Sequence, residues 1–117
     1  DVLCLSDYDK GLAGCGVMEN AIRAAHQNGL CVSAGPKPLN MGCFANADFL
    51  SLNQKEASEA AGLKLDSDVA VEAAGEALRR QSSAKALVIT RGSKGLTLFQ
   101  NGSEPRHIRA HEVEVFD

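Results

Sequence analysis

Two residues whose chemistry suits metal and phosphate binding stand at the start of a predicted helix. Asn53 and Glu56 lie three positions apart, and helical spacing places them on one face. An amide and a carboxylate can hold a hydrated Mg²⁺ ion, which keeps most of its waters and touches few protein ligands. The free N–H groups of a first helical turn also favour an anion. The same pair is close to a capping-box pattern, so a purely structural role stays open.

The turn of residues 90–95, with the sequence Thr-Arg-Gly-Ser-Lys-Gly, is a second candidate. Two glycines let the backbone come close to a nucleotide phosphate or ribose, which makes Thr90, Arg91, Gly92 and Gly95 candidate nucleotide ligands. The pattern G-x-x-x-x-G-K-[ST] does not occur in this sequence, so this is not a Walker A loop. A tight turn into a hairpin also accounts for the spacing.

Three further charged residues lie in predicted loops. Lys10 is suited to meet a phosphate, and Asp7 can accept a hydrogen bond from a sugar hydroxyl. Lys37 stands between two prolines, and a stiff loop suits a charge that must be held in place. Each of the three is equally compatible with an ordinary solvated loop.

Alternating strands and helices must position these residues. Apolar runs predict four strands, of which the first and the last are expected to be buried: residues 1–5, 30–33, 49–52 and 86–90. The segment 34–46 is expected to be a loop without regular helix, because Pro36 and Pro38 interrupt it.

Three helices are predicted between the strands. One has apolar residues at helical spacing from Met18 to Ala25 and ends at Gly29, and a second runs from Asn53 to near Gly62. The third spans residues 67–81, and its small side chains would let it lie close to a sheet. Its expected apolar face consists of Ala70, Ala73, Ala74, Ala77 and Leu78.

The end of the chain has a different pattern. Residues 96–100 and 106–110, joined by an Asn-Gly turn at 101–102, predict a hairpin, and residues 113–116 predict a last strand. The alternation before it predicts an α/β fold with a parallel sheet flanked by helices.

Ligands bind such sheets beyond the carboxyl ends of the strands. All four segments that follow the predicted parallel strands are therefore expected at one rim. They are residues 6–10, 34–37, 53–56 and 90–95.

Composition excludes several classes of function. The 117 residues are 44% hydrophobic and 23% charged, with a net charge of −3, which is typical of a globular domain and does not favour nucleic acid. No apolar stretch approaches the roughly 20 residues that span a membrane, and no signal peptide is visible. His107 and His111 lie four apart without a cysteine pair, so zinc is not expected.

The cysteines bear on the cellular compartment. The four of them, Cys4, Cys15, Cys31 and Cys43, form no C-x-x-C pair. Cys4 and Cys31 sit in apolar runs, where a thiol behaves as a small hydrophobe. A reduced, cytoplasmic protein is the simple interpretation, with a disulfide framework as the alternative. The absence of a starting Met is compatible with a processed chain or a piece of a longer one.

Taken together, these segments resemble the ribokinase (PfkB) family of carbohydrate kinases, and within it the heptose 7-phosphate kinases of ADP-heptose synthesis. The resemblance covers nearly the whole chain. It is carried by residues 6–11, 36–38, 47–57, 90–95 and 107–117.

The resemblance implies an incomplete ribokinase-like (Rossmann-like) fold, with ATP and Mg²⁺ as cofactors and a sugar phosphate as partner. Its Asn-x-x-Glu motif maps onto Asn53 and Glu56, which would order Mg²⁺ and phosphate through water. Its Thr-Arg-Gly-x-x-Gly turn implicates the turn of residues 90–95 in nucleotide binding. Its Asp-Tyr-x-Lys-Gly segment places Asp7 and Lys10 near the phosphoryl-transfer site.

The sequence departs from the family pattern in two ways. Gly35 stands where the family usually has Asp before the Pro-Lys pair. The family's Gly-Ala-Gly-Asp motif, which supplies the anion hole and the general base, would come just after Asp117. Residues 1–117 are therefore expected to be the central segment of one kinase domain, without the N-terminal portion that holds the sugar site and lid.

The segment is expected to be inactive alone, with no catalytic base of its own, and to expose sheet edges through which a homodimer could form. Two alternatives stay open. One is a non-catalytic domain that binds nucleotide or sugar phosphate, and the other is a structural or interaction domain of the same fold.

Overall fold

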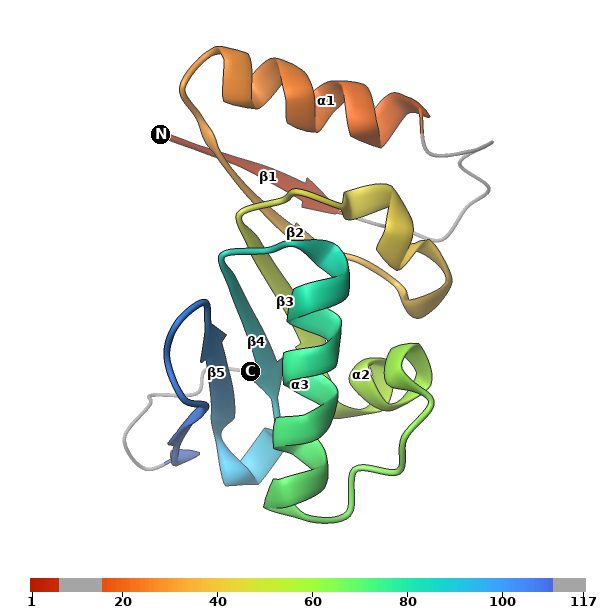
Figure 1. Cartoon of the computed structure of the whole chain (residues 1–117), viewed down its shortest axis with the longest axis vertical. Helices are drawn as coiled ribbons and strands as arrows, with labels where there is room; N and C mark the ends of the chain where they lie inside the picture. The colour runs from red at the N-terminus through yellow and green to blue at the C-terminus, as the bar shows by residue number, and fades with distance from the viewer. Residues whose placement is uncertain (7–15, 111–117) are drawn as a thin grey trace.

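The structure is a computed structural model that describes residues 1–6 and 16–110. Six strands form one sheet in chain order, the first four parallel and the last two antiparallel (Figure 1). They are β1 (Val2–Ser6), β2 (Cys31–Gly35), β3 (Phe49–Asn53), β4 (Ala86–Thr90), β5 (Leu96–Gln100) and β6 (Arg106–Ile108). The predicted α/β sheet with a C-terminal hairpin is confirmed. Asp7, Lys10 and the predicted strand at 113–116 lie outside the described residues.

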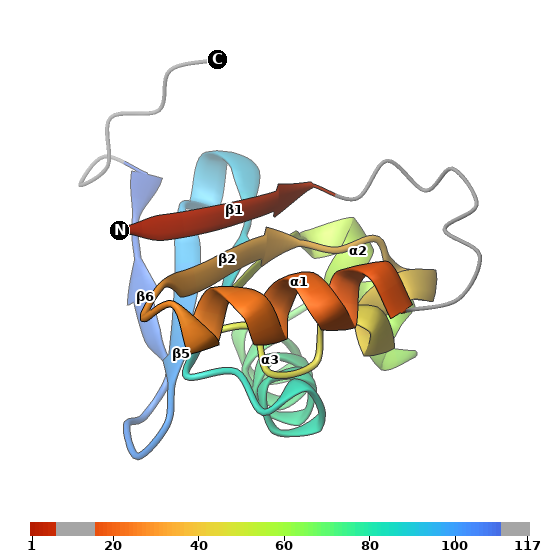
Figure 2. The same cartoon turned by 90° about the horizontal axis from the view of Figure 1, so that it is seen from above.

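The helices pack on one face of this sheet (Figure 2). Each parallel strand lies one place further along than the strand before it, so crossovers of one hand leave their helices on the same side. The helices are α1 (Gly16–Gln27), η1 (Pro38–Phe44), α2 (Gln54–Ala61), α3 (Asp68–Ser82) and η2 (Gly92–Lys94). Among the described residues, none of these helices has the length and apolar character needed to cross a membrane.

Alternate strand residues form the core under the helices. Side chains of successive strand residues point to opposite faces, so every second residue of β2, β3, β4 and β5 is buried. These core residues are Val32, Ala34, Leu50, Leu52, Leu87, Ile89, Thr97 and Phe99.

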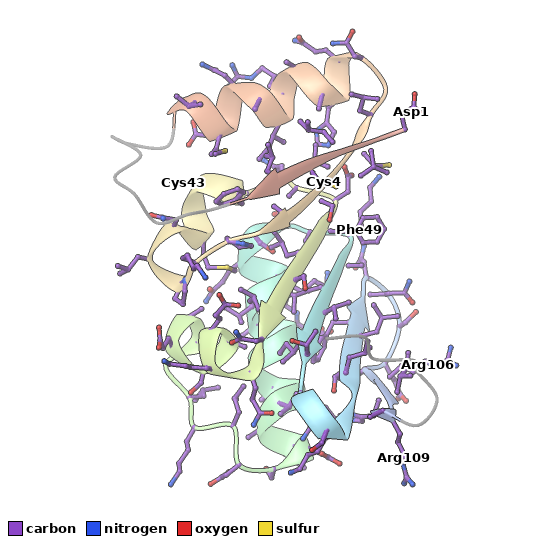
Figure 3. The ribbon with its side chains drawn as sticks, turned by 180° about the vertical axis from the view of Figure 1, so that it is seen from behind. Asp1, Cys4, Cys43, Phe49, Arg106 and Arg109 are labelled. Atoms are coloured by element: carbon purple, nitrogen blue, oxygen red, sulfur yellow. The ribbon has the colours of Figure 1, made fainter. Side chains whose placement is uncertain are left out.

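The opposite face of the sheet is partly exposed in the part of the chain described, although Ala86 on β4 is buried there. Phe49 keeps 47% of its surface exposed and Val2 keeps 59%. Figure 3, which shows the molecule from behind, places Cys4 and Phe49 on β1 and β3. The prediction of a buried first strand is wrong, because β1 is an edge strand. Cys4 and Cys31, which the sequence places in apolar runs, are both free, exposed thiols. Cys4 lies on the edge strand β1, whereas Cys31 lies on the inner strand β2 and alternates with the buried Val32.

The close approach predicted for the third helix is confirmed, but the face that makes it differs. α3 buries Val71, Ala74, Gly75 and Leu78, whereas Ala73 is exposed. A β-carbon at Gly75 would overlap the ring of Phe99, so only glycine lets the helix lie this close to β5. The predicted face thus included Ala73, which is exposed, and left out Val71 and Gly75, which are buried.

The ends of the first two helices are confirmed, whereas the loop predicted between β2 and β3 is not. Gly29 and Gly62 have φ of 73° and 68° after α1 and α2, as expected for residues that end helices. The segment 34–46 was expected to contain no helix, and this is wrong. Pro38 begins the 3₁₀ helix η1, at a position where its missing N–H leaves no helical bond unmade.

Candidate active site

Three of the four predicted segments meet at one rim of the sheet, which we call the carboxyl rim and define by the ends of β2, β3 and β4 at Gly35, Asn53 and Thr90. Asn53 is paired in register with Thr90. Ser6 is the first residue of the fourth segment, 6–10, and the last that the structure describes there; it is paired with Gly35 at the same rim. The rule that parallel strands present their following loops on one side therefore brings these segments together.

Asn53 and Glu56 form a complete capping box at the start of α2. The Glu56 backbone N–H donates to Asn53 Oδ1 at 2.7 Å, and the Asn53 backbone N–H donates to Glu56 Oε1 at 3.0 Å. The capping interpretation is thus confirmed as local geometry. It occupies only one oxygen of the Glu56 carboxylate and leaves the other to face the rim.

Lys37 reaches that second oxygen. Its Nζ atom lies 3.2 Å from Glu56 Oε2, with 45% of the Lys37 side chain and 19% of the Glu56 side chain exposed. The pair joins the stiff Pro-Lys-Pro segment to the start of α2. A shallow groove of about 290 Å³ opens beside it, lined by Lys37, Pro38, Leu39, Asn53, Lys55, Glu56 and Glu59.

The donor set at this groove suits a hydrated Mg²⁺ ion and not a fully dehydrated one. The described residues contain no cluster of three His, Cys, Asp or Glu side chains able to enclose a metal. One carboxylate and one amide oxygen can still hold Mg²⁺ through its waters, because this ion dehydrates reluctantly. Asn53 and Glu56 therefore fit the role that the family resemblance implies.

The glycine turn after β4 is held in one conformation by its own backbone. The Arg91 N–H donates to the Gly95 carbonyl at 2.7 Å, and the Gly95 N–H donates to the Gly92 carbonyl at 3.0 Å. Gly95 has φ of 96°, and a β-carbon there would overlap the Ile108 carbonyl oxygen. Gly92 has φ of 58° and faces open space. A nucleotide phosphate can therefore approach the backbone at Gly92. Gly95, by contrast, is required by the conformation and packing of the turn.

Arg91 belongs to a polar cluster on the helix side of the sheet, which we call the Arg91 cluster. Its members are Asp68 and Glu72 on α3, Arg91 after β4, Thr97 on β5 and His107 on β6. Arg91 Nη2 lies 2.9 Å from Asp68 Oδ1, and Arg91 Nη1 lies 3.4 Å from His107 Nδ1. The hydrogen bond and the charge of Arg91 hold the pKa of Asp68 below its usual value.

A cavity of about 850 Å³ opens beside this cluster. It is lined by Asp68, Arg91, Ser93, Lys94, His107, Arg109 and Ala110. The sequence indicated Arg91 as a nucleotide ligand, but only 6% of its side chain is exposed. The structure therefore brings Thr90 and Gly92 to the rim and turns the Arg91 side chain toward α3.

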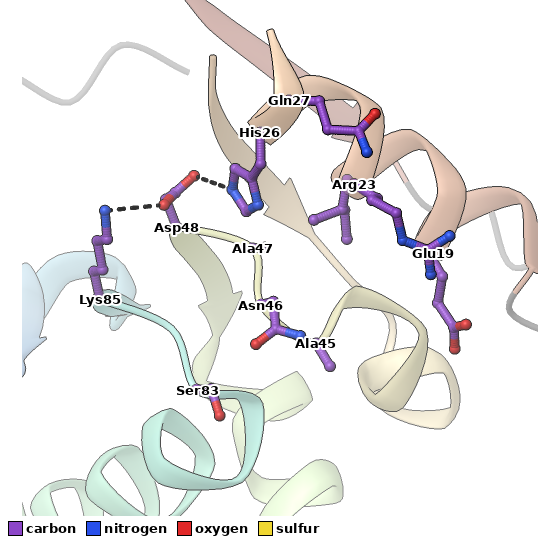
Figure 4. A pocket seen from close by; sticks show the side chains of 11 residues that line it. Glu19, Arg23, His26, Gln27, Ala45, Asn46, Ala47, Asp48, Ser83 and Lys85 are labelled. Atoms are coloured by element: carbon purple, nitrogen blue, oxygen red, sulfur yellow. Dashed lines mark hydrogen bonds and ion pairs between the residues drawn. The ribbon is translucent and has the colours of Figure 1, made fainter. Parts of the chain in front are cut away.

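A second polar cluster lies at the opposite rim, where β3 and β4 begin (Figure 4). The Asp48 carboxylate is nearly buried and accepts the Val32 N–H at 2.7 Å. His26 Nε2 lies 2.9 Å away, and Lys85 Nζ lies 3.4 Å from its other oxygen. Burial alone would raise the pKa of Asp48, but hydrogen bonds from Val32, His26 and Lys85 lower it overall. This cluster ties α1 to two strands.

Sequence reasoning missed most residues of both clusters. The sequence does not favour His107 as a zinc ligand and otherwise includes it only in the resembling segment 107–117, while Asp68 falls only within the helix predicted for residues 67–81. No local spacing signals these contacts, because the partners are far apart in the chain: Asp68 is 23 positions before Arg91, and His107 follows it by 16.

Comparison with solved structures defines the class of fold. A mutant of phosphofructokinase-2 from Escherichia coli aligns with a TM-score of 0.77 and 18% identity, over 92% of this chain and 36% of that one. Ribokinase from Arabidopsis thaliana, solved with ribose and ATP, aligns with a TM-score of 0.75 and 20% identity, over 92% and 34%. The fold is ribokinase-like, as the sequence predicted.

Sequence comparison defines the family. The profile of the pfkB family carbohydrate kinases matches residues 10–117, so the chain belongs to this family. The bifunctional protein HldE of Caulobacter vibrioides is 40% identical over the whole chain, and that of Nitrobacter hamburgensis is 34% identical. The chain spans 24% of the length of these relatives.

Proposed function

We propose that this chain is part of an ATP-dependent sugar kinase, which transfers the γ-phosphoryl group of ATP to a sugar hydroxyl. One observation carries the proposal. In a chain of the pfkB family, the capped helix start at Asn53, the cation of Lys37 and the open turn at Gly92 lie along one rim of the sheet. Phosphoryl transfer needs this combination, because positioning and charge neutralisation supply most of its rate.

Each residue at the carboxyl rim would have a separate role in binding the substrates. Thr90 and Gly92 would contact the nucleotide from the end of β4, while Gly95 closes their turn. Lys37 would neutralise a phosphate, since it is already held at the rim by Glu56. Asn53 and Glu56 would hold a hydrated Mg²⁺, which neutralises charge on the transferring phosphates. Asp7 and Lys10 are proposed to contribute to the transfer site from the segment after β1.

The proposed acceptor is heptose 7-phosphate. The similarity to HldE proteins supports this choice, as do the motifs that resemble heptose kinases. The general base is expected in the sequence after Asp117, so residues 1–117 would bind substrates without turning them over. A base and an anion hole typically contribute several orders of magnitude in rate.

Titration of Mg-ATP and Mg-ADP into this chain tests the binding half of the proposal, with heat or chemical shifts as the signal. Glu56→Ala and Gly92→Val should both weaken binding, the first by removing a charge at the metal and the second by filling the space above the turn. Gly102→Val is the matched control, because Gly102 also has positive φ and open space but lies in the β5–β6 loop. Equal weakening by all three variants, or no binding by the folded chain, contradicts the proposal.

The full-length protein tests the catalytic half. ADP release should depend on heptose 7-phosphate more strongly than on fructose 6-phosphate or ribose. A non-catalytic binding domain remains the second candidate, because Gly35 removes a carboxylate that the family usually has at this rim. Binding of Mg-ATP with no turnover of any sugar by the full-length protein would favour that candidate.

A further inference from the structure

We propose that Arg91 is a positioning residue: held by Asp68 and His107, it fixes the turn of residues 90–95 instead of touching the nucleotide. The proposal rests on the proposed function, because it concerns how that turn is presented to ATP. It assigns to Asp68, Arg91 and His107 a role that spacing along the chain does not indicate.

The guanidinium group of Arg91 already has interaction partners within the protein. Its guanidinium group contacts Asp68 on one side and His107 on the other, at 2.9 Å and 3.4 Å. Only 6% of the side chain is exposed, and its Nε atom is buried with no hydrogen-bond partner among the described residues. Although Arg91 lines the neighbouring cavity, this low exposure leaves little of the guanidinium group open to a phosphate while the Asp68 pair is in place. The contacts therefore suit an internal support better than a ligand.

The neighbours of the His107 ring favour the tautomer with its proton on Nε2. Arginine can only donate, so the Nδ1 atom facing Arg91 Nη1 must accept. The Thr97 hydroxyl, 2.8 Å from the same Nδ1 atom, is the nearer donor, so the single lone pair of Nδ1 accepts mainly from Thr97 and makes only a longer, weaker contact with Arg91 at 3.4 Å. The ring proton is left on Nε2, which lies 3.4 Å from the Glu72 carboxylate. Because Thr97 is fully buried, this arrangement anchors the ring to the core.

Arg91 contributes to the turn of residues 90–95 through both its side chain and its backbone. The Arg91 N–H donates to the Gly95 carbonyl, and the Arg91 carbonyl accepts the Lys94 N–H at 3.2 Å. Thr90 and Gly92, the two residues proposed to face the nucleotide, flank Arg91 on either side. Asp68 and His107 thereby connect α3 and β6 to the two positions where the ligand would bind. A displacement of about 1 Å in such a turn is enough to weaken binding and catalysis.

Variants at Asp68 test the proposal in the full-length protein, because 68% of the Asp68 side chain is exposed and its loss should not prevent folding. Asp68→Ala should weaken Mg-ATP affinity and raise the KM for ATP about three- to thirtyfold, with a smaller change in kcat. Arg91→Met should do the same. The double variant should be no worse than the worse single one, because both changes remove the same support. Asp66→Ala is the matched control, an exposed carboxylate two positions earlier, and should change nothing.

Each other outcome overturns the proposal in a recognisable way. If Arg91→Met weakens binding and Asp68→Ala does not, Arg91 contacts the nucleotide directly. If both variants lower the melting temperature but leave ATP affinity unchanged, the cluster is structural only. If the wild-type protein does not bind Mg-ATP at all, the proposed function fails and this inference fails with it.

The tautomer of His107 supplies a test that needs no nucleotide. Long-range ¹H–¹⁵N correlation spectra at neutral pH should show His107 with its proton on Nε2 and a bare Nδ1. Asp68→Ala should leave that tautomer in place, since Thr97 still donates to Nδ1. A proton on Nδ1 in the wild-type protein would show that Arg91 cannot be held as described.

Discussion

The two oxygens of the Glu56 carboxylate have separate partners: Oε1 accepts the backbone N–H of Asn53 at 3.0 Å, and Oε2 lies 3.2 Å from Lys37 Nζ. One oxygen therefore completes a helix cap, while the other joins a cation at the carboxyl rim. A glutamate that only capped the helix would need no charge. The ion pair with Lys37 is an interaction that requires the negative charge of Glu56.

Glu56→Gln separates these two uses. The glutamine oxygen can still accept the Asn53 N–H, so the free energy of unfolding should fall by less than about 1 kcal/mol. Mg-nucleotide affinity should nevertheless drop about tenfold or more, because the carboxylate charge near the metal is lost. Calorimetry with Mg-ADP checks the affinity and urea unfolding checks the stability. Glu104→Gln removes the same charge from the β5–β6 loop and should leave both unchanged; if Glu56→Gln behaves like this control, Glu56 is a cap alone.

The two glycines of the turn should respond differently to alanine. Gly95→Ala should destabilise the fold by at least about 2 kcal/mol, because it adds a clash with the Ile108 carbonyl to an unfavourable φ. Gly92→Ala should cost about 1–2 kcal/mol, the usual penalty of a left-handed conformation in open space. Urea unfolding of both variants beside Gly102→Ala, another open position with positive φ, checks the order. Equal losses at Gly92 and Gly95 would mean that β6 does not pack against the turn as described.

Gly75→Ala should destabilise the protein although alanine is the better helix former. The added methyl group would overlap the Phe99 ring and force α3 away from β5, at a cost of about 1–3 kcal/mol. Phe99→Leu in the same chain should recover part of this loss, and a double-mutant cycle measures the coupling. Ala73→Ser, on the exposed side of α3, is the control and should have little effect. If the losses of Gly75→Ala and Phe99→Leu simply add, α3 does not lie as close to β5 as described.

The polar cluster around Asp48, formed with Val32, His26 and Lys85, should make the free energy of unfolding depend on pH in the acid range. The pKa of Asp48 is lower in the folded protein than its ordinary value of 3.8, so its contribution is complete above that value and disappears as pH falls through the folded pKa. Asp48→Asn should cost about 1–3 kcal/mol at neutral pH, because the buried acceptor of Val32, His26 and Lys85 is weakened. Urea unfolding of both proteins from pH 7 to pH 3 should show this difference shrinking below about pH 4. A difference that stays constant over that range contradicts the assignment.

Gly35 can be tested by restoring the family carboxylate. A β-carbon added at Gly35 would have the Ser51 carbonyl oxygen as its nearest atom, at 3.6 Å, an ordinary contact, and the φ of Gly35 is not positive. Gly35→Asp should therefore change the free energy of unfolding by no more than about 0.5 kcal/mol. The added carboxylate at the carboxyl rim should lower the Mg²⁺ concentration that half-saturates nucleotide binding. Gly16→Asp, at a position where an added β-carbon meets no atom within 4 Å, controls for the added charge; a large loss of stability in Gly35→Asp would show that packing requires glycine.

Much of this fold follows from local features of the chain. Strands β4 and β5 begin and end where the apolar runs predict, and the Asn53–Glu56 spacing predicts a capping box that the structure contains. These features depend on residues within a few positions of one another. The alternation of strands and helices, together with the handedness of crossovers, then brings Gly35, Asn53 and Thr90 to one rim without any knowledge of long-range contacts.

Only the tertiary structure decided which side chains face that rim. The sequence placed Arg91 among the nucleotide ligands and treated His107 as a poor zinc candidate, but packing of α3 against β5 and β6 joins the two in one cluster. The same packing placed Gly75 in the buried face of α3, and the order of strands in the sheet left β1 at an exposed edge. Contacts between distant segments depend on how whole elements pack, and that information is not contained in the spacing of residues along one helix or strand.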